Sequence, residues 1–216
     1  GIILEHSFHT NTRVIKWLSS DSNLQKLAKA EAECIASYYG VTKNEETTFT
    51  KIMGNAVATV EQMTEYIKAK NPDVAQSVID MIPFYLSEGK AEGVRGDLAF
   101  AQSCLETGNF GFSRSAVTLE QSNFCGMGVT SNGMRGNTFA TPQLGIRAQV
   151  QHLKAYASTV DLKNECVDPR FKYVARGCAE YLEWLGQKEN LDGRGWAAGA
   201  GYGAKIITIL NAIIGI

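Results

Sequence analysis

The chain has 216 residues, of which 44% are hydrophobic, and its formal net charge is −1 at pH 7. A chain of this length and composition can bury a full core, so we expect one main domain with some additional material. The near-neutral charge argues against a general nucleic-acid binder, and no membrane span is expected because a run of about eighteen apolar residues does not occur.

Residues 1–6 show neither the basic region nor the cleavage site of a signal peptide, and they begin without a Met inside an apolar run. We therefore expect the chain to be a fragment of a longer protein. The five cysteines are scattered without Cys-x-x-Cys spacing, which predicts reduced, mostly buried thiols. Neither a disulfide framework nor a metal site is predicted, and no cofactor is expected.

The first forty residues predict a strand at residues 2–4 and a helix over residues 23–39. Residues 3–11, 16–18 and 35–40 resemble the closing strand and helix of zinc-dependent N-acetylmuramoyl-L-alanine amidases. The resemblance places Glu5 where that family's Glu assists the metal-bound water, but the family's zinc ligands lie earlier in its pattern and are missing here. We interpret residues 1–40 as the C-terminal remnant of an amidase-like α/β domain without amidase activity.

A polar, charged stretch over residues 41–50 is predicted to be a linker to the main domain, residues 51–216. The strand before it has no sheet of its own, and an unpaired strand is an exposed edge. Self-association through residues 1–40 is therefore an open alternative to the monomer that we otherwise expect.

The main domain is predicted to begin with a short docking strand at residues 52–54. Thr59 and Gln62 have the form of a capping box that opens a helix ending near Lys70. A second helix ends near Gly89, with a kink or break at Pro83. The central helix follows over residues 93–107.

Residues 108–142 are rich in Gly, Ser, Thr and Asn, and the Asn-Gly pair at 132–133 predicts a β-hairpin. Helices are then predicted over residues 143–158, 171–185 and 203–214. The expected fold is mainly α (α+β), a lysozyme-like helical domain with a small β-hairpin lobe, preceded by the strand–helix remnant.

The central helix is apolar around most of its circumference and carries Glu106 in its last turn. Gly108 can take the left-handed conformation that ends a helix. A carboxyl here faces the negative end of the helix dipole and an apolar wall, so we expect its pKa to be raised. A raised pKa suits a general acid at neutral pH, whereas an exposed Glu at a helix end is the plainer alternative.

Three sequence blocks stand in order: Ala101-Gln102-Ser103-Cys104-Leu105-Glu106-Thr107-Gly108, then Asn123-Phe124-Cys125-Gly126-Met127, then Trp196-Ala197 with Gly201-Tyr202-Gly203-Ala204-Lys205-Ile206. They resemble the helix end, β-lobe entrance and closing helix of glycoside hydrolase family 73. Its members cut the β-1,4 bond after N-acetylglucosamine in bacterial peptidoglycan. With residues 168–173, the resemblance is closest to clostridial autolysins and their phages' lysins. It implies action at the bacterial cell wall, or presence in the host cytoplasm before release for a phage lysin.

The resemblance maps the family's acid onto Glu106, which would protonate the glycosidic oxygen. Some relatives carry a second carboxylate in the β-lobe, but residues 121–160 contain no Asp or Glu. Glu120 is the nearby carboxylate, and its catalytic role stands beside its interpretation as a loop residue capping a turn. A substrate-assisted route, in which the 2-acetamido group attacks the anomeric carbon, is the alternative. Tyr202 matches the family's functional Tyr and would steady that amide or the oxocarbenium-like state, unless it is a core aromatic.

Four residues are candidates for binding substrate: Asn123, Phe124, Gly126 and Trp196. Asn123 could hydrogen-bond an acetamido group, and Phe124 could form an apolar wall. Trp196 could stack on a sugar face, although core packing is an equal alternative. Gln149 is a weaker cleft candidate, and His152 is expected to be structural.

The leading hypothesis is an endo-acting peptidoglycan N-acetylglucosaminidase with Glu106 as general acid, whose partners are glycan strands. A muramidase or a lytic transglycosylase is the alternative among enzymes, because lysozyme-like folds share the lone Glu. A non-catalytic wall-binding module that keeps the cleft is the alternative from another class.

Overall fold

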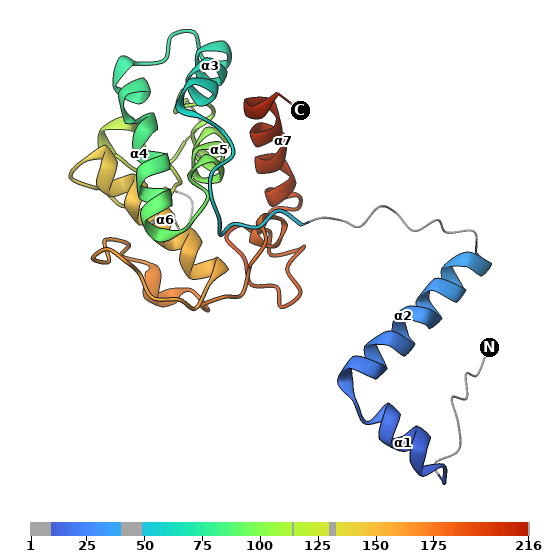
Figure 1. Ribbon diagram of the computed structural model, residues 1–216. Helices are drawn as coiled ribbons and strands as arrows, with labels where there is room; N and C mark the ends of the chain where they lie inside the picture. Colours follow the sequence, from blue (N-terminus) through green and yellow to red (C-terminus); the bar gives the residue numbers. More distant parts are fainter. Residues whose placement is uncertain (1–9, 40–48, 114, 130–132, 216) are drawn as a thin grey trace. The chain divides into compact units, whose positions relative to one another are not determined.

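The structure of the protein is a computed structural model that describes residues 10–39, 49–113, 115–129 and 133–215. The chain divides into two compact units, Gly1–Thr48 and Phe49–Ile216, and each is described by itself (Figure 1). Within the described ranges, no helix is both long and apolar enough to cross a membrane.

The first unit contains α1 (Thr12–Leu18) and α2 (Asp21–Tyr38). α2 agrees with the predicted helix over residues 23–39, whereas α1 has no counterpart among the predicted elements. The side chain of Asn11 caps α1 by accepting from the Val14 N–H at 3.2 Å, and neither helix contains a buried residue. The predicted strand at residues 2–4 and most of the predicted linker lie outside the described residues, so the amidase resemblance stays a prediction.

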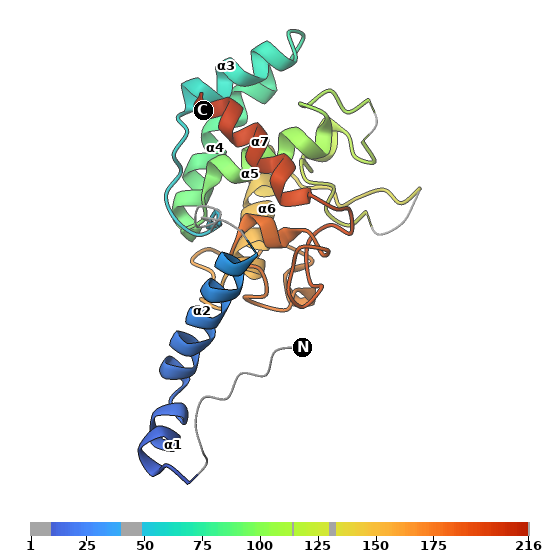
Figure 2. The same ribbon diagram turned by 90° about the vertical axis from the view of Figure 1, so that its right-hand side faces the viewer.

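The second unit is built around α5 (Gly96–Thr107), which is buried along nearly its whole length. Four helices pack around or beside it, as Figures 1 and 2 show: α3 (Val60–Lys70), α4 (Gln76–Glu92), α6 (Pro142–Ala157) and α7 (Tyr202–Ile214). α5 packs directly on α4, α6 and α7. The mainly helical part of the predicted fold is confirmed. The apolar stripe of the central helix is wide enough to face several helices at once, which explains this packing.

Local helix signals agree with the structure at both ends. Thr59 and Gln62 form the predicted capping box at the start of α3, with side chains and backbone N–H groups bonded reciprocally. Gly108 ends α5 in the left-handed conformation with φ of 60°. The predicted break at Pro83 is wrong, because α4 runs through it to Glu92. Pro83 is exposed, so the carbonyl of Ile79, which a proline cannot pair, can bond water instead.

The predicted β-hairpin lobe is wrong for the described residues, which show no strand between residues 108 and 142. This segment forms loops around one short 3-10 helix, η1 (Leu119–Gln121). Side-chain amides replace strand pairing. Asn123 Nδ2 donates to the carbonyls of Met127 and Asn137, at 2.8 and 2.9 Å. Residues 130–132, which include the Asn of the predicted turn, lie outside the described residues.

The predicted helix over residues 171–185 is also wrong. Two short 3-10 helices, η2 (Phe171–Tyr173) and η3 (Leu182–Leu185), stand in its place. Three backbone N–H groups of this segment bond outside it: Gly177 and Ala179 donate to carbonyls at the end of α6, and Leu182, the first residue of η3, donates to Thr50. These N–H groups are therefore not available to a helix.

Two further predictions need correction. Residues 52–54 do not form a strand, because the pairing is limited to isolated bridges, Lys51 with Tyr181 and Met53 with Val94. All five cysteines are free, as predicted, but they are not mostly buried, since Cys34 and Cys166 are exposed and Cys178 is half-buried.

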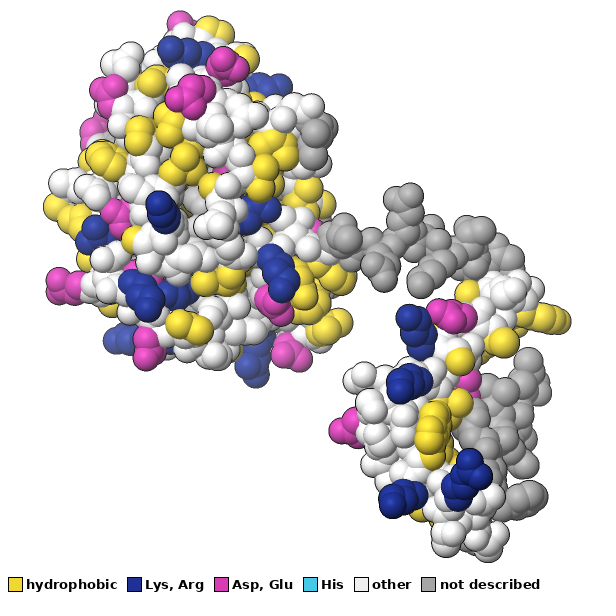
Figure 3. All heavy atoms as spheres, viewed as in Figure 1, with side chains coloured by type: hydrophobic (Ala, Val, Ile, Leu, Met, Phe, Trp, Pro, Cys, Tyr) yellow, Lys and Arg dark blue, Asp and Glu magenta, His cyan; other side chains and the backbone are white. Residues whose placement is uncertain are grey.

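The surface of the second unit mixes charges of both signs. On the face seen in Figure 3, Lys and Arg side chains lie among Asp, Glu and hydrophobic side chains, without forming one basic patch. The chain as a whole carries 21 basic and 22 acidic residues. Such a surface does not produce an extended field of one sign.

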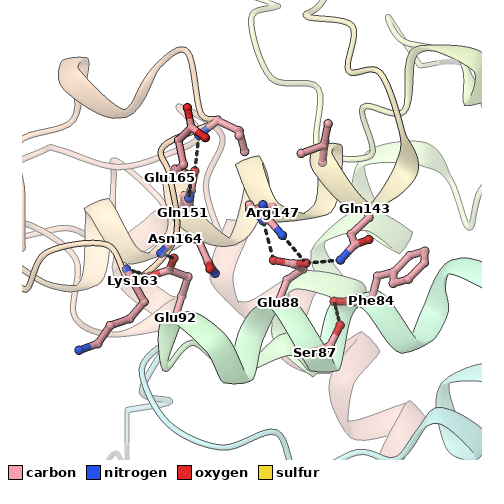
Figure 4. Close-up of polar contacts among 12 residues, drawn as sticks. Phe84, Ser87, Glu88, Glu92, Gln143, Arg147, Gln151, Lys163, Asn164 and Glu165 are labelled. Carbon is pink, nitrogen blue, oxygen red and sulfur yellow. Dashed lines mark hydrogen bonds and ion pairs between the residues drawn. The ribbon is translucent and has the colours of Figure 1, made fainter.

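Buried ion pairs join α4 to α6 and to the loop that follows α6 (Figure 4). Glu92 accepts from Lys154 Nζ at 2.9 Å and from the backbone N–H groups of Lys163 and Asn164, also at 2.9 Å. One turn earlier on α4, Glu88 pairs with Arg147 at 2.8 Å. Burial raises the pKa of Glu92. The hydrogen bonds from two backbone N–H groups and from Lys154, together with the Lys154 charge, lower it by more, so the net pKa lies below 4.5.

Replacing Glu92 by Gln should lower the free energy of unfolding by about 3 kcal/mol, because the Lys154 ammonium would stay buried without a counter-charge. Urea unfolding at pH 7 measures this loss. Because the folded-state pKa of Glu92 is depressed, its contribution is fully present above pH 4.5 and is lost as the pH falls through the folded-state value. The exposed Glu61→Gln variant is the control, and its free energy of unfolding should stay close to that of the unaltered protein. An E92Q effect of equal size at pH 7 and pH 3 would contradict the assignment.

Candidate active site

Two of the predicted catalytic residues are in direct contact. Glu106 lies in the last turn of α5, and Tyr202 is the first residue of α7. The Tyr202 hydroxyl donates to Oε1 of Glu106 at 2.5 Å, although the two residues are 96 positions apart in the sequence. The side chain of Tyr202 is only 7% exposed, and Glu106 is half-buried. The packing of α7 against α5, seen in Figure 2, therefore creates the pair.

The environment of this pair raises the pKa of both side chains. Burial raises the pKa of Glu106 above its ordinary 4.5, and the hydrogen bond from Tyr202 opposes part of this rise. Burial raises the pKa of Tyr202 well above 10, and the negative charge of Glu106 adds to the effect. Tyr202 therefore stays protonated and acts as a donor, while Glu106 is held closer to its neutral form than an exposed Glu. The raised pKa agrees with the expectation from the helix end.

The start of α7 is held in place by two contacts. At Gly203, an added Cβ would lie 2.3 Å from the carbonyl oxygen of Leu182, so α7 approaches η3 more closely than any other residue would allow. The backbone N–H of Gly201, just before α7, donates to Glu189 Oε1 at 2.9 Å. These contacts set the position of Tyr202 relative to Glu106.

A cavity of about 440 Å³ lies near the pair and reaches it through Gly126, although neither Glu106 nor Tyr202 is among the residues that line it. Gly126 lies at its edge, and a Cβ added there would be 3.8 Å from Oε2 of Glu106. Trp196 lines the same cavity and packs edge-to-face against His152, with ring centroids 4.8 Å apart. His152 Nδ1 lies 2.7 Å from Asp168 Oδ2, which is the kind of partner expected for a structural histidine. Other residues of the lining include Tyr156, Arg170, Tyr173 and Gln187.

The four predicted substrate-binding residues fall into two groups. Gly126 and Trp196 line the cavity and can meet a ligand directly. Asn123 is 0% exposed, and its side chain holds the loop together by donating to two carbonyls and accepting from Met127 N–H at 3.0 Å. Phe124 is 1% exposed and belongs to the core, where it packs on Phe110. Contact of Asn123 or Phe124 with substrate stays a prediction. In the structure both side chains hold the loop that carries Gly126, Asn123 by hydrogen bonds and Phe124 by packing in the core.

Glu120, the third predicted catalytic residue, lies in η1 and is exposed. Hydrogen bonds from the Thr118 hydroxyl and from its own backbone lower its pKa, which agrees with the interpretation of a loop Glu at a turn. Among the described residues that line the cavity, none is an Asp or a Glu.

The sequence prediction missed a buried glutamine next to Tyr202. Gln102 Nε2 donates to the Tyr202 hydroxyl at 2.9 Å, and Gln102 itself is 0% exposed. It lies four residues before Glu106, so both side chains lie on one face of α5. A polar residue inside an otherwise apolar helical stripe was the available signal. Gln149, a weaker cleft candidate from the sequence, is fully buried behind Gln102.

Comparison with known proteins decides the family. Residues 82–214 match the glucosaminidase family described as "Mannosyl-glycoprotein endo-beta-N-acetylglucosaminidase". The chain belongs to this family, glycoside hydrolase family 73. It is therefore a glycoside hydrolase that acts on peptidoglycan.

One relative is an uncharacterized protein of Borreliella burgdorferi. It is 38% identical over 156 residues, which cover 72% of each of the two chains. No solved structure matches the glucosaminidase chain. In the part of the chain that the structure describes, no group of three or more His, Cys, Asp or Glu side chains is placed to hold a metal ion.

Replacing Gly203 by Ala should reduce hydrolysis of purified cell walls at least about tenfold, because the added Cβ would push the start of α7, and with it Tyr202, away from Glu106. Turbidity loss of a wall suspension measures this rate. Gly199→Ala is the control, since nothing lies within 4 Å of its added Cβ and it lies in the loop just before α7. Equal rates for the two variants would show that the close contact of α7 does not position the site.

Proposed function

We propose that the protein is an endo-β-N-acetylglucosaminidase that hydrolyses the β-1,4 bond after N-acetylglucosamine in bacterial peptidoglycan, with Glu106 as its general acid. The observation that carries this proposal is a carboxyl with a raised pKa, bonded by a buried tyrosine and lying beside Gly126, which lines an open cavity. A carboxyl of this kind is neutral over part of the range in which an exposed Glu is ionised, so it can donate a proton to a leaving oxygen.

For the second catalytic group we favour the 2-acetamido group of the substrate over Glu120. Glu120 is exposed in η1, and it is not among the residues that line the cavity beside Gly126. In this route the acetamido oxygen attacks C1 as Glu106 protonates the departing oxygen of the next sugar. Water then attacks C1, gives a proton back to Glu106 and restores the acetamido group. Tyr202 holds the Glu106 carboxylate between the two steps.

The cavity supports an extended glycan as substrate. Trp196 and Tyr156 lie in contact with each other, with ring centroids 5.9 Å apart, and Tyr173 lines the same space. Flat aromatic faces suit the apolar side of a pyranose. Arg170 adds a positive charge that would suit the carboxylates of stem peptides on a glycan strand.

The activity is proposed to reside in residues 51–216, and residues 1–40 remain a proposed amidase remnant. The division of the chain after Thr48 supports this arrangement. The proposed place of action is the bacterial cell wall, outside the cell or, for a phage lysin, after release from the host cytoplasm.

Replacing Glu106 by Gln should lower the rate of wall hydrolysis by about 10² to 10⁴, because the amide keeps the shape of the acid but has no proton to transfer. The wild-type rate should fall as the pH rises through the raised pKa of Glu106, since only the protonated form is active. Release of soluble reducing sugar from purified walls measures both. Glu120→Gln is the matched comparison and should keep most of the activity. Wild-type rates for E106Q would overturn the role of Glu106, and a large loss for E120Q would favour a two-carboxyl mechanism.

Digestion of purified peptidoglycan should generate new reducing ends on N-acetylglucosamine, because the cut follows that sugar. Mass spectrometry after borohydride reduction identifies the reduced sugar. Reduced muramic acid would indicate a muramidase, and anhydro-muramic ends would indicate a lytic transglycosylase. Pull-down of the protein on walls with no released fragments would indicate a wall-binding module.

A further inference from the structure

Behind Tyr202, buried polar side chains from four helices form a continuous chain of hydrogen bonds. Tyr85 OH donates to Ser103 Oγ at 2.9 Å, and Ser103 Oγ lies 3.0 Å from Gln149 Oε1. Gln149 Nε2 donates to Gln102 Oε1, and Gln102 Nε2 donates to the Tyr202 hydroxyl, both at 2.9 Å. Every member behind Tyr202 is 0% exposed. A buried polar chain of this length is costly unless each group is paired, so its geometry is well defined.

The direction of the chain is set by one backbone carbonyl. Gln149 Nε2 also donates to the carbonyl of Ala99, at 2.9 Å. A carbonyl oxygen can only accept, so a flipped Gln149 would place its own oxygen against that of Ala99. Gln149 therefore presents Nε2 to Gln102 and Oε1 to Ser103. Ser103 Oγ also lies 3.1 Å from the Ala99 carbonyl oxygen. Whichever of these two acceptors receives the Ser103 proton, the Ala99 carbonyl still sets the orientation of Gln149.

The orientation of Gln149 passes to Gln102 and then to Tyr202. Gln102 must offer Oε1 to Gln149, which leaves its Nε2 facing the Tyr202 hydroxyl. The tyrosine oxygen then accepts from Gln102, and its single proton is directed to Oε1 of Glu106. Oε2 of Glu106 faces Gly126 at the edge of the cavity.

We propose that Gln102 and Gln149 are positioning residues that hold the Tyr202 hydroxyl as a donor to Oε1 of Glu106, so that the acid delivers its proton from Oε2. A neutral carboxyl has one proton, and Oε1 already accepts one from Tyr202. When the Oε2–H bond breaks, the proton passes to the glycosidic oxygen as its bond to C1 breaks. The proton-delivery part rests on the proposed function, whereas the direction of the chain is a property of the folded protein.

The chain also limits how far the pKa of Glu106 rises. Tyr202 from α7 shifts the pKa of Glu106, and the charge of Glu106 in turn raises the pKa of Cys125, in the loop before Gly126. Burial raises the pKa of Tyr202 and of Cys125, so they stay protonated and neutral. A donor to Oε1 stabilises the carboxylate more than the neutral acid, because hydrogen bonds to an ionised acceptor are stronger. Turning Tyr202 away from Glu106 should therefore raise the pKa of Glu106 further.

The Gln102→Glu variant tests this direction at pH values above the pKa of the new carboxyl, where only acceptor oxygens face Tyr202 and one of them takes its proton. The side-chain carboxyl of Glu106 is titrated by ¹³C NMR without substrate, with its signal assigned by comparison with Glu106→Gln. We expect the pKa of Glu106 to rise by about one unit and the alkaline limb of the kcat pH profile to move by the same amount. Gln151→Glu is the matched control. This glutamine is also 0% exposed on α6 but bonds the carbonyl of Glu165, so its variant should leave the Glu106 titration unchanged.

The new charge of Q102E could act on Glu106 without Tyr202, and a double-mutant cycle separates the two effects. Tyr202→Phe alone should raise the pKa of Glu106 by a similar amount, and adding Gln102→Glu to it should change the value little. A fully additive shift would overturn the proposal. The unaltered protein gives a second measurement, in which the side-chain NH₂ protons of Gln102 should show nuclear Overhauser effects to the Tyr202 ring. If those protons instead contact Gln149 alone, the chain runs the other way.

The titration and the product analysis fail independently. Shifted titrations together with no new N-acetylglucosamine ends would reject the proposed function and keep the positioning role. N-acetylglucosamine ends together with an unshifted titration in Q102E would reject the positioning role and keep the function.

Discussion

The contact between the end of α5 and the start of α7 is the interaction on which the rest of the site depends. It buries the Tyr202 hydroxyl against Glu106 and closes the pair off from much of the solvent. Burial alone would raise the pKa of a carboxyl but would not fix its orientation. The hydrogen bond from Tyr202 fixes the orientation, because it occupies one carboxyl oxygen and leaves the other facing Gly126, which lines the cavity. Acidity and geometry of Glu106 are therefore set by the same contact.

That contact is maintained by close backbone approach rather than by large side chains. Gly203 lets α7 meet η3, and Gly96 lets α5 meet α4, where a Cβ would lie 2.1 Å from the carbonyl of Tyr85. Such approaches leave little room for the helices to shift, because protein interiors are packed to crystal-like density. The ion pairs of Glu92 and Glu88 then tie α4 to α6 on the far side of the bundle. A rigid bundle is what a general acid needs, since small displacements of a reacting group cost large factors in rate.

The segment between α5 and α6 shows how a loop can be ordered without strands. Asn123 and Gln121 use their side-chain amides to hold carbonyls that a hairpin would have paired through its backbone. This places Gly126 beside Glu106 and the cavity in front of it. The same segment supplies no carboxylate to the described lining, which is why the acetamido group of the substrate is the better candidate for the second catalytic group.

The sequence by itself determined the helical character of the main domain, the cap at Thr59 and the end of α5 at Gly108, and it singled out Glu106, whose role as general acid is our proposal. Helical period and capping depend on residues within a few positions of one another, so a pattern can report them. The tertiary structure alone decided that Gln102 and Gln149 stand behind Tyr202, and in which direction their amides point. It also decided that the N–H groups of Gly177, Ala179 and Leu182 bond to α6 and Thr50 instead of forming a helix. In each of these cases the hydrogen-bond partner lies on a distant element, and no local pattern encodes which distant group will be there.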